Sequence, residues 1–434
     1  MEKFSKKIVG AVEIPEEKFS FFQKKIKNIS DLKERVEDTL KKSVTEVLEV
    51  ILGGTVILRA SDIHFEPEEE KAKLRTRIDG ILLDVTNIEP KIYELLLSRI
   101  KLLSELKLNI TDRPQDGRFS ILIPGLAMET RVSSLPSEYG ESIVIRVLNP
   151  KSLISLDELG LRADLLGLFE KEIQKPNGMI IVTGPTGSGK TTTLYAFLKK
   201  IHKPEIKIIT IEDPIEYHLE GISQTQVAAE KGYDFASGLK AIIRQDPDVI
   251  LVGEIRDLET ANIALQAALT GHLVFSTLHT NDATGTIARL VNLKAKPADI
   301  GPAVNLIVAQ RLIRKVCQKC AKLEKPSDQI LEKLKKELKG IAQEVKIPKI
   351  GLELKIPKVV GCKDCNFTGY RGRTGIYEAF LVDDEMEKFI LTNPSIASLR
   401  ELAIKKGMVT MKQDGLIKVL EGMTTIEEVE RATG

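Results

Sequence analysis

The sequence lacks any apolar stretch long enough to cross a membrane. A membrane-spanning helix needs about 18 consecutive apolar residues, and no apolar run in this chain approaches that length. The first residues, Met1 to Lys7, also lack the apolar stretch of a secretory signal peptide. We therefore expect a cytoplasmic protein.

The chain also has very little net charge. Its 64 basic residues balance 62 acidic ones, which leaves +2 at neutral pH. Overall charge thus gives no argument for binding nucleic acid or a membrane surface, so any such contact has to be local. Tryptophan is absent and cysteine occurs four times, whereas 42% hydrophobic and 29% charged residues are typical of a soluble globular protein. The 434 residues suffice for about two to four domains.

A glycine-rich loop is the strongest motif that is present. The apolar run Met179 to Val182 predicts a buried strand, and apolar residues at helical spacing follow from Leu194 to Ile201. Between them, Gly184 to Thr191 matches a P-loop, in which backbone N–H groups surround a phosphate, Lys190 reaches the β- and γ-phosphates and Thr191 holds Mg²⁺. A glycine turn without a ligand is the less favoured alternative. The expected nucleotide-binding residues are Gly184, Pro185, Thr186, Gly187, Ser188, Gly189, Lys190, Thr191 and Thr192.

Acidic residues follow two further predicted strands. Asp248 to Glu254 has the layout of a Walker B strand, with Glu254 at its carboxyl end, where it could approach Mg²⁺ beside the P-loop. The segment Ile211 to His218 carries three carboxylates in five positions, which suits metal binding or the activation of water. A solvated acidic loop is the alternative for that segment.

Two of the five histidines, His272 and His279, bracket the predicted strand 273–277. A single histidine is more often structural than catalytic, but two on a strand next to the nucleotide favour a role at the phosphates.

The four cysteines form two C-x-x-C pairs with none left over. Cys317 and Cys320 form one pair, and Cys362 and Cys365 form the other. This pattern predicts a closed tetrahedral Zn²⁺ site with a structural role. Two disulfides are the alternative, which a reducing cytoplasm disfavours.

The pattern of strands and helices predicts an α/β protein. Strict alternation at 71–79 indicates a half-exposed strand, and further strand signals predict a small α+β domain. Alternating strands and helices then predict a nucleotide-binding core with a doubly wound parallel sheet. The expected divisions are an N-terminal tail with short helices (1–42), the α+β domain (43–150), a linker (151–161), the core (162–310), a zinc subdomain (311–380) and a C-terminal helical segment (381–434).

Taken together, these motifs resemble the secretion ATPase superfamily of type II secretion and type IV pilus assembly motors. The resemblance runs from about residue 40 to the end of the chain. It is carried by the Walker A box (184–191), the Asp box (211–217), the Walker B box (246–257), the His box (270–280), the cysteine pairs, and the segments 61–64, 113–118 and 131–136.

The resemblance implies a RecA-like core, a PAS-like N-terminal domain and a cytoplasmic homo-hexamer that hydrolyses ATP to move an inner-membrane platform protein and assemble pilin-like subunits. It assigns Glu216 as the base that orients water and Glu254 as the Walker B acid. It also places His272 and His279 near the γ-phosphate. Arg131 and Arg146 of the N-terminal domain would close over the triphosphate. The cysteine pairs are typical of the assembly branch. Assembly motors usually carry a further N-terminal domain, for which about 40 residues are too few.

Two other classes of protein share such a core. A nucleic-acid translocase is disfavoured, because no basic strip is interleaved with aromatic residues and the lysines of 322–358 are balanced by glutamates. A nucleotide-gated scaffold without hydrolysis is disfavoured because every expected acid and histidine is present. We therefore expect ATP, Mg²⁺ and Zn²⁺ as cofactors and no direct nucleic-acid partner.

Overall fold

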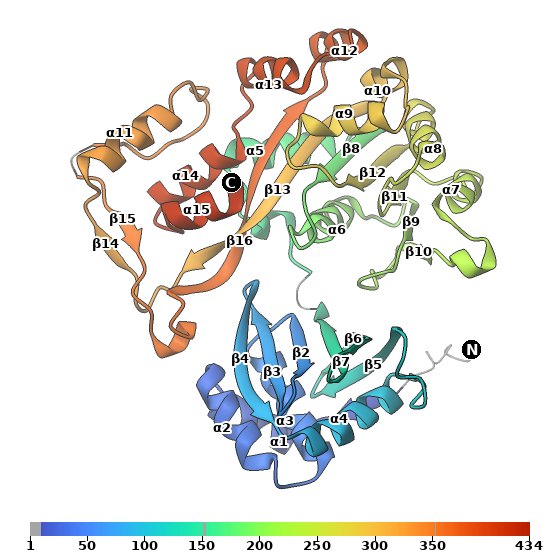
Figure 1. The fold of residues 1–434 in the computed structure, drawn as a ribbon. Helices are drawn as coiled ribbons and strands as arrows, with labels where there is room; N and C mark the ends of the chain where they lie inside the picture. The colour runs from blue at the N-terminus through green and yellow to red at the C-terminus, as the bar shows by residue number, and fades with distance from the viewer. Residues whose placement is uncertain (1–9, 151–152, 352) are drawn as a thin grey trace. The chain divides into compact units, whose positions relative to one another are not determined.

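The computed structural model describes residues 10–150, 153–351 and 353–434, and Figure 1 traces them. They form two compact units. The first holds the described residues up to Pro150 together with Cys317–Cys320 and Val360–Arg371, and the second holds the rest. The first nine residues of the expected tail and the first two of the expected linker lie outside the described residues. Among the described helices, none is both long and apolar enough to cross a bilayer.

The first unit is a seven-stranded sheet with helices packed on one face (Figure 1). The strand order is β1-β5-β6-β7-β2-β3-β4, antiparallel except for the β1–β5 pair. Because side chains alternate along each strand, one face carries apolar residues against the helices and the other carries polar ones. The strands are β1 (Ala11–Glu13), β2 (Asp62–Pro67), β3 (Ala72–Ile78), β4 (Ile81–Ile88), β5 (Gln115–Ile123), β6 (Leu126–Ser137) and β7 (Gly140–Leu148). The helices are α1 (Glu16–Lys25), α2 (Ile29–Thr39), α3 (Val44–Ile57) and α4 (Pro90–Leu103).

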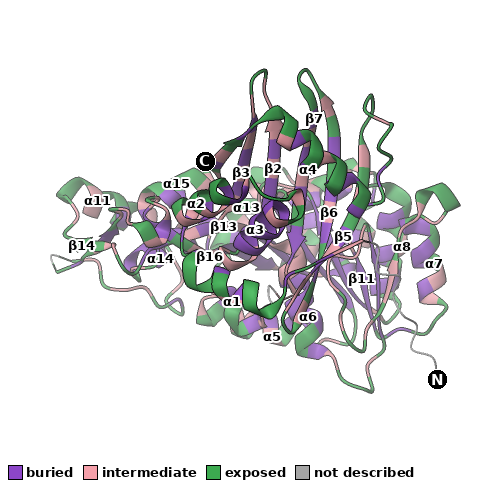
Figure 2. Ribbon diagram, turned by 90° about the horizontal axis from the view of Figure 1, so that it is seen from below, coloured by how far each residue is buried: buried purple, intermediate pink, exposed green. Residues whose placement is uncertain are grey.

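The segment 10–42 differs from the expected tail, because it is built into this domain. Strand β1 pairs in parallel with β5, and Phe19 and Phe22 of α1 are buried. These two residues lie three positions apart and therefore share one face of the helix. That face packs against α3, where a Cβ added to Gly53 would lie 2.7 Å from the Phe22 ring. In Figure 2, α3 is accordingly buried from Val47 to Thr55.

The second unit is a second seven-stranded sheet, in the order β10-β9-β11-β12-β8-β13-β16. In this spatial order, all strands from β10 through β13 run parallel to one another. Helices α5 and α6 cover one face and helices α7 to α10 the other, so the central strands are buried on both faces. The strands are β8 (Gly178–Thr183), β9 (Ile208–Glu212), β10 (Ser223–Gln226), β11 (Val249–Val252), β12 (Leu273–Leu278), β13 (Val304–Val316) and β16 (Tyr370–Leu381). The helices are α5 (Ala163–Glu172), α6 (Lys190–Ile201), α7 (Phe235–Ile243), α8 (Leu258–Leu269), α9 (Gly285–Asn292) and α10 (Pro297–Ala303), with short 3₁₀ turns η2 (Leu156–Leu159) and η3 (Ala229–Lys231).

The stretch 311–380 is not a separate subdomain, because its two ends belong to the core sheet. Strand β13 continues past residue 311 as far as Val316, and β16 forms the edge of the same sheet. The middle of the stretch packs with the C-terminal helices in a small apolar cluster of its own. The remaining elements are the β14 (Lys322–Glu324) and β15 (Ile356–Lys358) pair, η4 (Lys363–Cys365), and helices α11 (Asp328–Glu337), α12 (Asp384–Leu391), α13 (Ile396–Lys405), α14 (Met411–Leu420) and α15 (Ile426–Thr433).

A buried ion pair fastens α15 to β13 and makes stability depend on pH. Glu428 lies 2.5 Å from Arg314 and 2.7 Å from Arg431. Burial alone would raise the pKa of Glu428, but hydrogen bonds from the two arginines outweigh it and lower that pKa to about 2. Because this pKa is lowered, ionised Glu428 stabilises the fold above the ordinary value of 4.5, and that contribution is lost as pH falls toward 2.

We expect Glu428→Gln to lower the free energy of unfolding by about 2 kcal/mol at pH 7, allowing for solvent screening. Chemical denaturation near pH 2.5 should show most of that difference gone, and a difference that does not change with pH would contradict the assignment.

Candidate nucleotide site and metal centre

The P-loop lies between the fully buried strand β8 and the first turn of α6. Gly184, Gly187 and Gly189 have φ values of 146°, 78° and 89°, which residues with a Cβ rarely adopt. Space is also short at the first of them, since a Cβ on Gly184 would lie 2.6 Å from the carbonyl oxygen of Gln310. Glycine is therefore required here for the chain to turn tightly from strand to helix. The turn leaves the N-terminus of a 12-residue helix open to an anion.

Lys190 is the first residue of α6, and its ammonium group lies over the loop. Its Nζ donates to the carbonyl oxygens of Gly184 at 2.9 Å and Pro185 at 3.2 Å. Burial lowers the pKa of Lys190, while the charge of Glu254 acts in the opposite direction. The half-buried Thr191 and Thr192 follow in the same turn. The side chains expected to hold phosphate and metal thus lie together at one end of the helix.

Glu254 follows β11 and is the centre of a charged cluster at the same edge of the sheet. It accepts a hydrogen bond from Arg256, which also lies 3.4 Å from Asp213. The Nε2 atom of His279 lies 3.3 Å from a Glu254 oxygen. Because parallel strands end at a common edge, β8, β9, β11 and β12 bring the P-loop, Asp213, Glu254 and His279 together.

His272 does not join this cluster. It precedes β12, whereas His279 follows it. The carbonyl of His272 accepts from the N–H of Gly178, at the start of β8, and its Nδ1 lies 3.0 Å from the carbonyl oxygen of Ala267. A strand of six residues separates the two histidines by roughly 20 Å. The expectation that both lie near one γ-phosphate is therefore wrong for a phosphate held by this P-loop.

Glu216 lies in the loop after β9, and the buried Glu212 connects that loop to the P-loop helix. Glu212 accepts hydrogen bonds from the Thr210 hydroxyl at 2.6 Å and the Gln224 amide at 3.2 Å. It also accepts one from the phenol of Tyr195 on α6. Burial raises the pKa of Glu212, and the charge of Glu216 raises it further. Sequence reasoning counted Glu212 only as one of three carboxylates, and missed Tyr195 as its partner.

In the first unit, arginines form a row across the polar face of the sheet. The strand register places Arg118, Arg131, Arg146, Asp62 and Arg77 directly opposite one another on five neighbouring strands. Directly paired residues point to the same side of a sheet. Asp62 lies 2.9 Å from Arg146 and 3.3 Å from Arg77. Although burial alone would raise the pKa of Asp62, its hydrogen bond with Arg146 and the arginine charges lower it overall. The row thus brings four guanidinium groups and the Asp62 carboxylate together on one face, and guanidinium is the side-chain group that matches the geometry of a phosphate.

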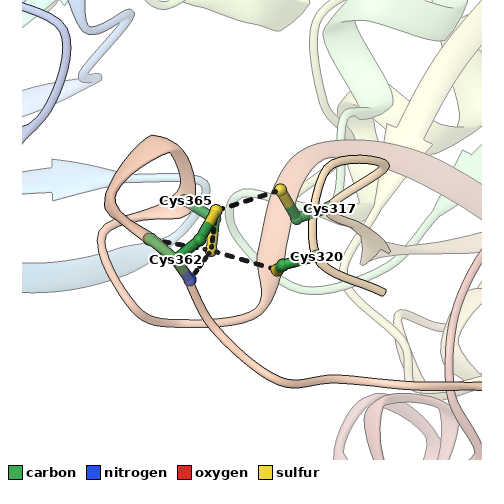
Figure 3. Close-up of side chains that lie close together, drawn as sticks. All are labelled: Cys317, Cys320, Cys362 and Cys365. Carbon is green, nitrogen blue, oxygen red and sulfur yellow. Dashed lines mark hydrogen bonds between the residues drawn. The ribbon is translucent and has the colours of Figure 1, made fainter. Parts of the chain in front are cut away.

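The four cysteine sulfurs converge, as Figure 3 shows. Distances between sulfurs are 3.9 Å for Cys317–Cys362, 3.8 Å for Cys320–Cys365 and 3.7 Å for Cys362–Cys365. A disulfide requires about 2.05 Å, and all four cysteines are free. Four thiolates on a tetrahedral ion, each at about 2.3 Å, would lie about 3.8 Å apart. The tetrad therefore has the dimensions of a closed metal site, which belongs to the first unit through Cys317–Cys320 and Val360–Arg371.

The geometry of the second unit defines a class of protein. A buried strand runs into a glycine loop and a helix, and an acid stands at the end of a strand in the same parallel sheet. That is the arrangement of a P-loop nucleoside triphosphatase. More narrowly, the chain belongs to the Type II/IV secretion system protein family, whose model matches residues 37–431. The resemblance drawn from the motifs is thereby confirmed.

Two named relatives locate the chain within that family. It is 42% identical over 404 residues to the type IV pilus assembly ATPase PilB of Myxococcus xanthus, covering 93% of this chain and 69% of that protein. It is 44% identical over 391 residues to the type II secretion system protein E of Pectobacterium carotovorum, covering 90% of this chain and 76% of that protein.

Solved structures support the fold. The pilus retraction motor PilT, solved with bound ADP, aligns with a TM-score of 0.58 and 27% identity, covering 88% of this chain and 95% of that one. The ATPase DotB of Legionella pneumophila aligns with a TM-score of 0.64 and 22% identity, covering 88% of this chain and 94% of that one. The expected α/β class with a P-loop core is thus confirmed.

Proposed function

We propose that this chain is an ATPase motor that uses Mg²⁺-dependent ATP hydrolysis to power assembly of a type IV pilus or a type II secretion pseudopilus. The observation that carries the proposal is the convergence of Lys190, Glu254 and His279 at one edge of the sheet. The relatives are named as a pilus assembly ATPase and a secretion protein.

Each group has a role in this mechanism. The P-loop amides and Lys190 hold the β- and γ-phosphates, and the Thr191 hydroxyl and Glu254 are placed to hold Mg²⁺ and its water. When bound, Mg²⁺ neutralises the charge that develops on the phosphates. Glu216 orients the attacking water as general base. His279 contacts Glu254 and is thereby placed at the end of the pocket where the γ-phosphate would lie.

The direct test is phosphate release by the purified chain, measured with ATP while Mg²⁺ is titrated. Hydrolysis that requires Mg²⁺ and is unchanged by added DNA supports the proposal. Hydrolysis that rises strongly with DNA would favour the nucleic-acid translocase, and the absence of hydrolysis would favour a nucleotide-gated scaffold.

We further propose that six copies assemble and act on an inner-membrane platform protein, as a cytoplasmic motor without direct contact to nucleic acid. The expected self-association is testable by light scattering with a slowly hydrolysed ATP analogue. A hexameric mass supports the proposal, and a monomer at all concentrations would contradict it.

The arginine row is part of this proposal, because Arg131 and Arg146 are expected to contact the triphosphate during hydrolysis. We expect Arg131→Ala to lower turnover about tenfold or more, since a cation on the transferring phosphate stabilises the charge that develops there. Steady-state phosphate release is the measurement. The matched control is Arg99→Ala, an exposed arginine on α4 of the same domain. If both variants turn over like the parent, the arginine row has no role in hydrolysis.

A further inference from the structure

Gln310 lies beneath the P-loop and makes two hydrogen bonds to it. The residue is on β13, one position past the Ala309–Thr183 pair at the end of β8, and its exposed fraction is 1%. Its Nε2 donates to the carbonyl oxygen of Ser188 at 2.7 Å. Its Oε1 accepts from the hydroxyl of Thr193, in the first turn of α6, at 2.8 Å. One buried amide thus joins the loop and the helix to the neighbouring strand.

Only one orientation of this amide satisfies both contacts. The carbonyl of Ser188 can only accept a hydrogen bond, so the NH₂ end of Gln310 has to face it. The oxygen end then faces Thr193, whose hydroxyl can donate. Of the side chains that carry no charge at neutral pH, glutamine and asparagine alone offer a donor and an acceptor side by side in this way, and asparagine is one methylene shorter.

The backbone of the loop also packs closely on this part of β13. A Cβ on Gly184 would lie 2.6 Å from the carbonyl oxygen of Gln310, and a Cβ on Gly189 would lie 3.2 Å from its Nε2. The P-loop therefore lies against Gln310 at three points, which are Gly184, Gly189 and the carbonyl group of Ser188.

We propose that Gln310 is a positioning residue for nucleotide binding, which fixes the Ser188 carbonyl against β13 so that the N–H groups of the loop face the phosphates. A carbonyl released from this contact could turn toward the phosphates and repel them. The inference rests on the proposed function, because it concerns the same nucleotide pocket. It adds a residue outside all the sequence motifs that marked that pocket.

The first test is Gln310→Met, which keeps the length of the side chain and removes both hydrogen bonds. Leaving the buried Ser188 carbonyl unpaired should weaken binding of a fluorescent ATP analogue by about 10- to 100-fold. The KM for ATP should rise by a similar factor with a smaller change in kcat, because the loop holds the phosphates before and during the reaction. The control is Gln266→Met, on the exposed face of α8. Equal affinity in both variants and the parent overturns the proposal.

The second test is Gln310→Glu, which distinguishes a hydrogen-bonding role from a packing role. A protonated glutamic acid can donate to Ser188 and accept from Thr193, whereas the carboxylate would face the Ser188 carbonyl and repel it. We therefore expect the analogue affinity of this variant, relative to the parent, to improve at least about fivefold as pH falls from 8 to 6, since burial raises the pKa of a carboxyl group. The Gln310→Met and Gln266→Glu variants should show no such change in their ratios to the parent. A ratio for Gln310→Glu that does not vary with pH overturns the proposal.

Failure of this inference and failure of the proposed function give different results. Binding of the analogue is measured without hydrolysis, so it tests Gln310 even if the parent does not release phosphate. If the parent hydrolyses ATP and Gln310→Met binds the analogue as tightly as the parent, the positioning role is wrong and the ATPase assignment stands.

Discussion

Replacing Glu254 by glutamine should abolish ATP hydrolysis while ATP still binds. The amide keeps the size of the side chain but removes the negative charge that would hold Mg²⁺ or its water in the proposed mechanism. It also weakens the contacts that Glu254 makes with Arg256 and His279. We expect turnover to fall by about 10² to 10³-fold, because charge stabilisation in the transition state is lost, with the affinity for a fluorescent ATP analogue changed by less than about threefold. Phosphate release and analogue binding on the same preparation are the measurements.

Two variants serve as controls for this prediction. Glu259→Gln removes a carboxylate of α8 that pairs with Lys240 at the surface, and it should turn over like the parent. Lys190→Ala should lose binding and hydrolysis together, because the proposed contact of this lysine with the phosphates is already made in the ground state. If Glu254→Gln hydrolyses ATP like Glu259→Gln, the Walker B assignment is wrong.

Periodicity and motif spacing predicted the parts of the fold that depend on residues close together in the sequence. Strict alternation at 71–79 placed β3, and the short apolar runs after the P-loop placed β9, β11 and β12. These patterns work because a strand buried on one face must alternate, and a strand buried on both faces must be apolar throughout. The edge shared by Lys190, Glu254 and His279 followed from the rule that parallel strands end together.

The rest of the fold depends on contacts between residues far apart in the chain. Phe19 and Phe22 lie in a charged segment, and only their shared helix face could have indicated burial. His272 was misplaced because a motif groups residues by sequence, whereas a six-residue strand separates the two histidines in space. The sequence does carry a signal for Gln310, because it is a polar residue directly after the apolar run 306–309 of the strand beside the P-loop. No pattern indicates that the cysteine pairs belong to the first unit.

Zinc is expected to bind the cysteine tetrad with a stoichiometry of one ion per chain. Cys365 is held in place from several sides, because it is buried and its sulfur accepts from the backbone N–H groups of Cys362 at 3.1 Å and Gly369 at 3.3 Å. Structural zinc contributes about 10 to 16 kcal/mol to the folding of small zinc-finger peptides. Elemental analysis of protein purified without chelator is the measurement, and a preparation without metal would contradict the assignment.

Cys365→Ser should release the metal and loosen the segments 317–320 and 360–371, while the P-loop core stays folded around its own apolar clusters. The loosening should also reach α2, because the N–H of Ile29 donates to the side chain of Asn366 at 2.7 Å. Hydrogen exchange should therefore rise in both cysteine segments and at the start of α2. Asn366→Ala is the matched control, since it removes only this link: zinc should be retained, exchange should rise at Ile29, and the cysteine segments should stay protected. Equal protection of α2 in the parent and both variants would show that the metal centre does not support the N-terminal domain.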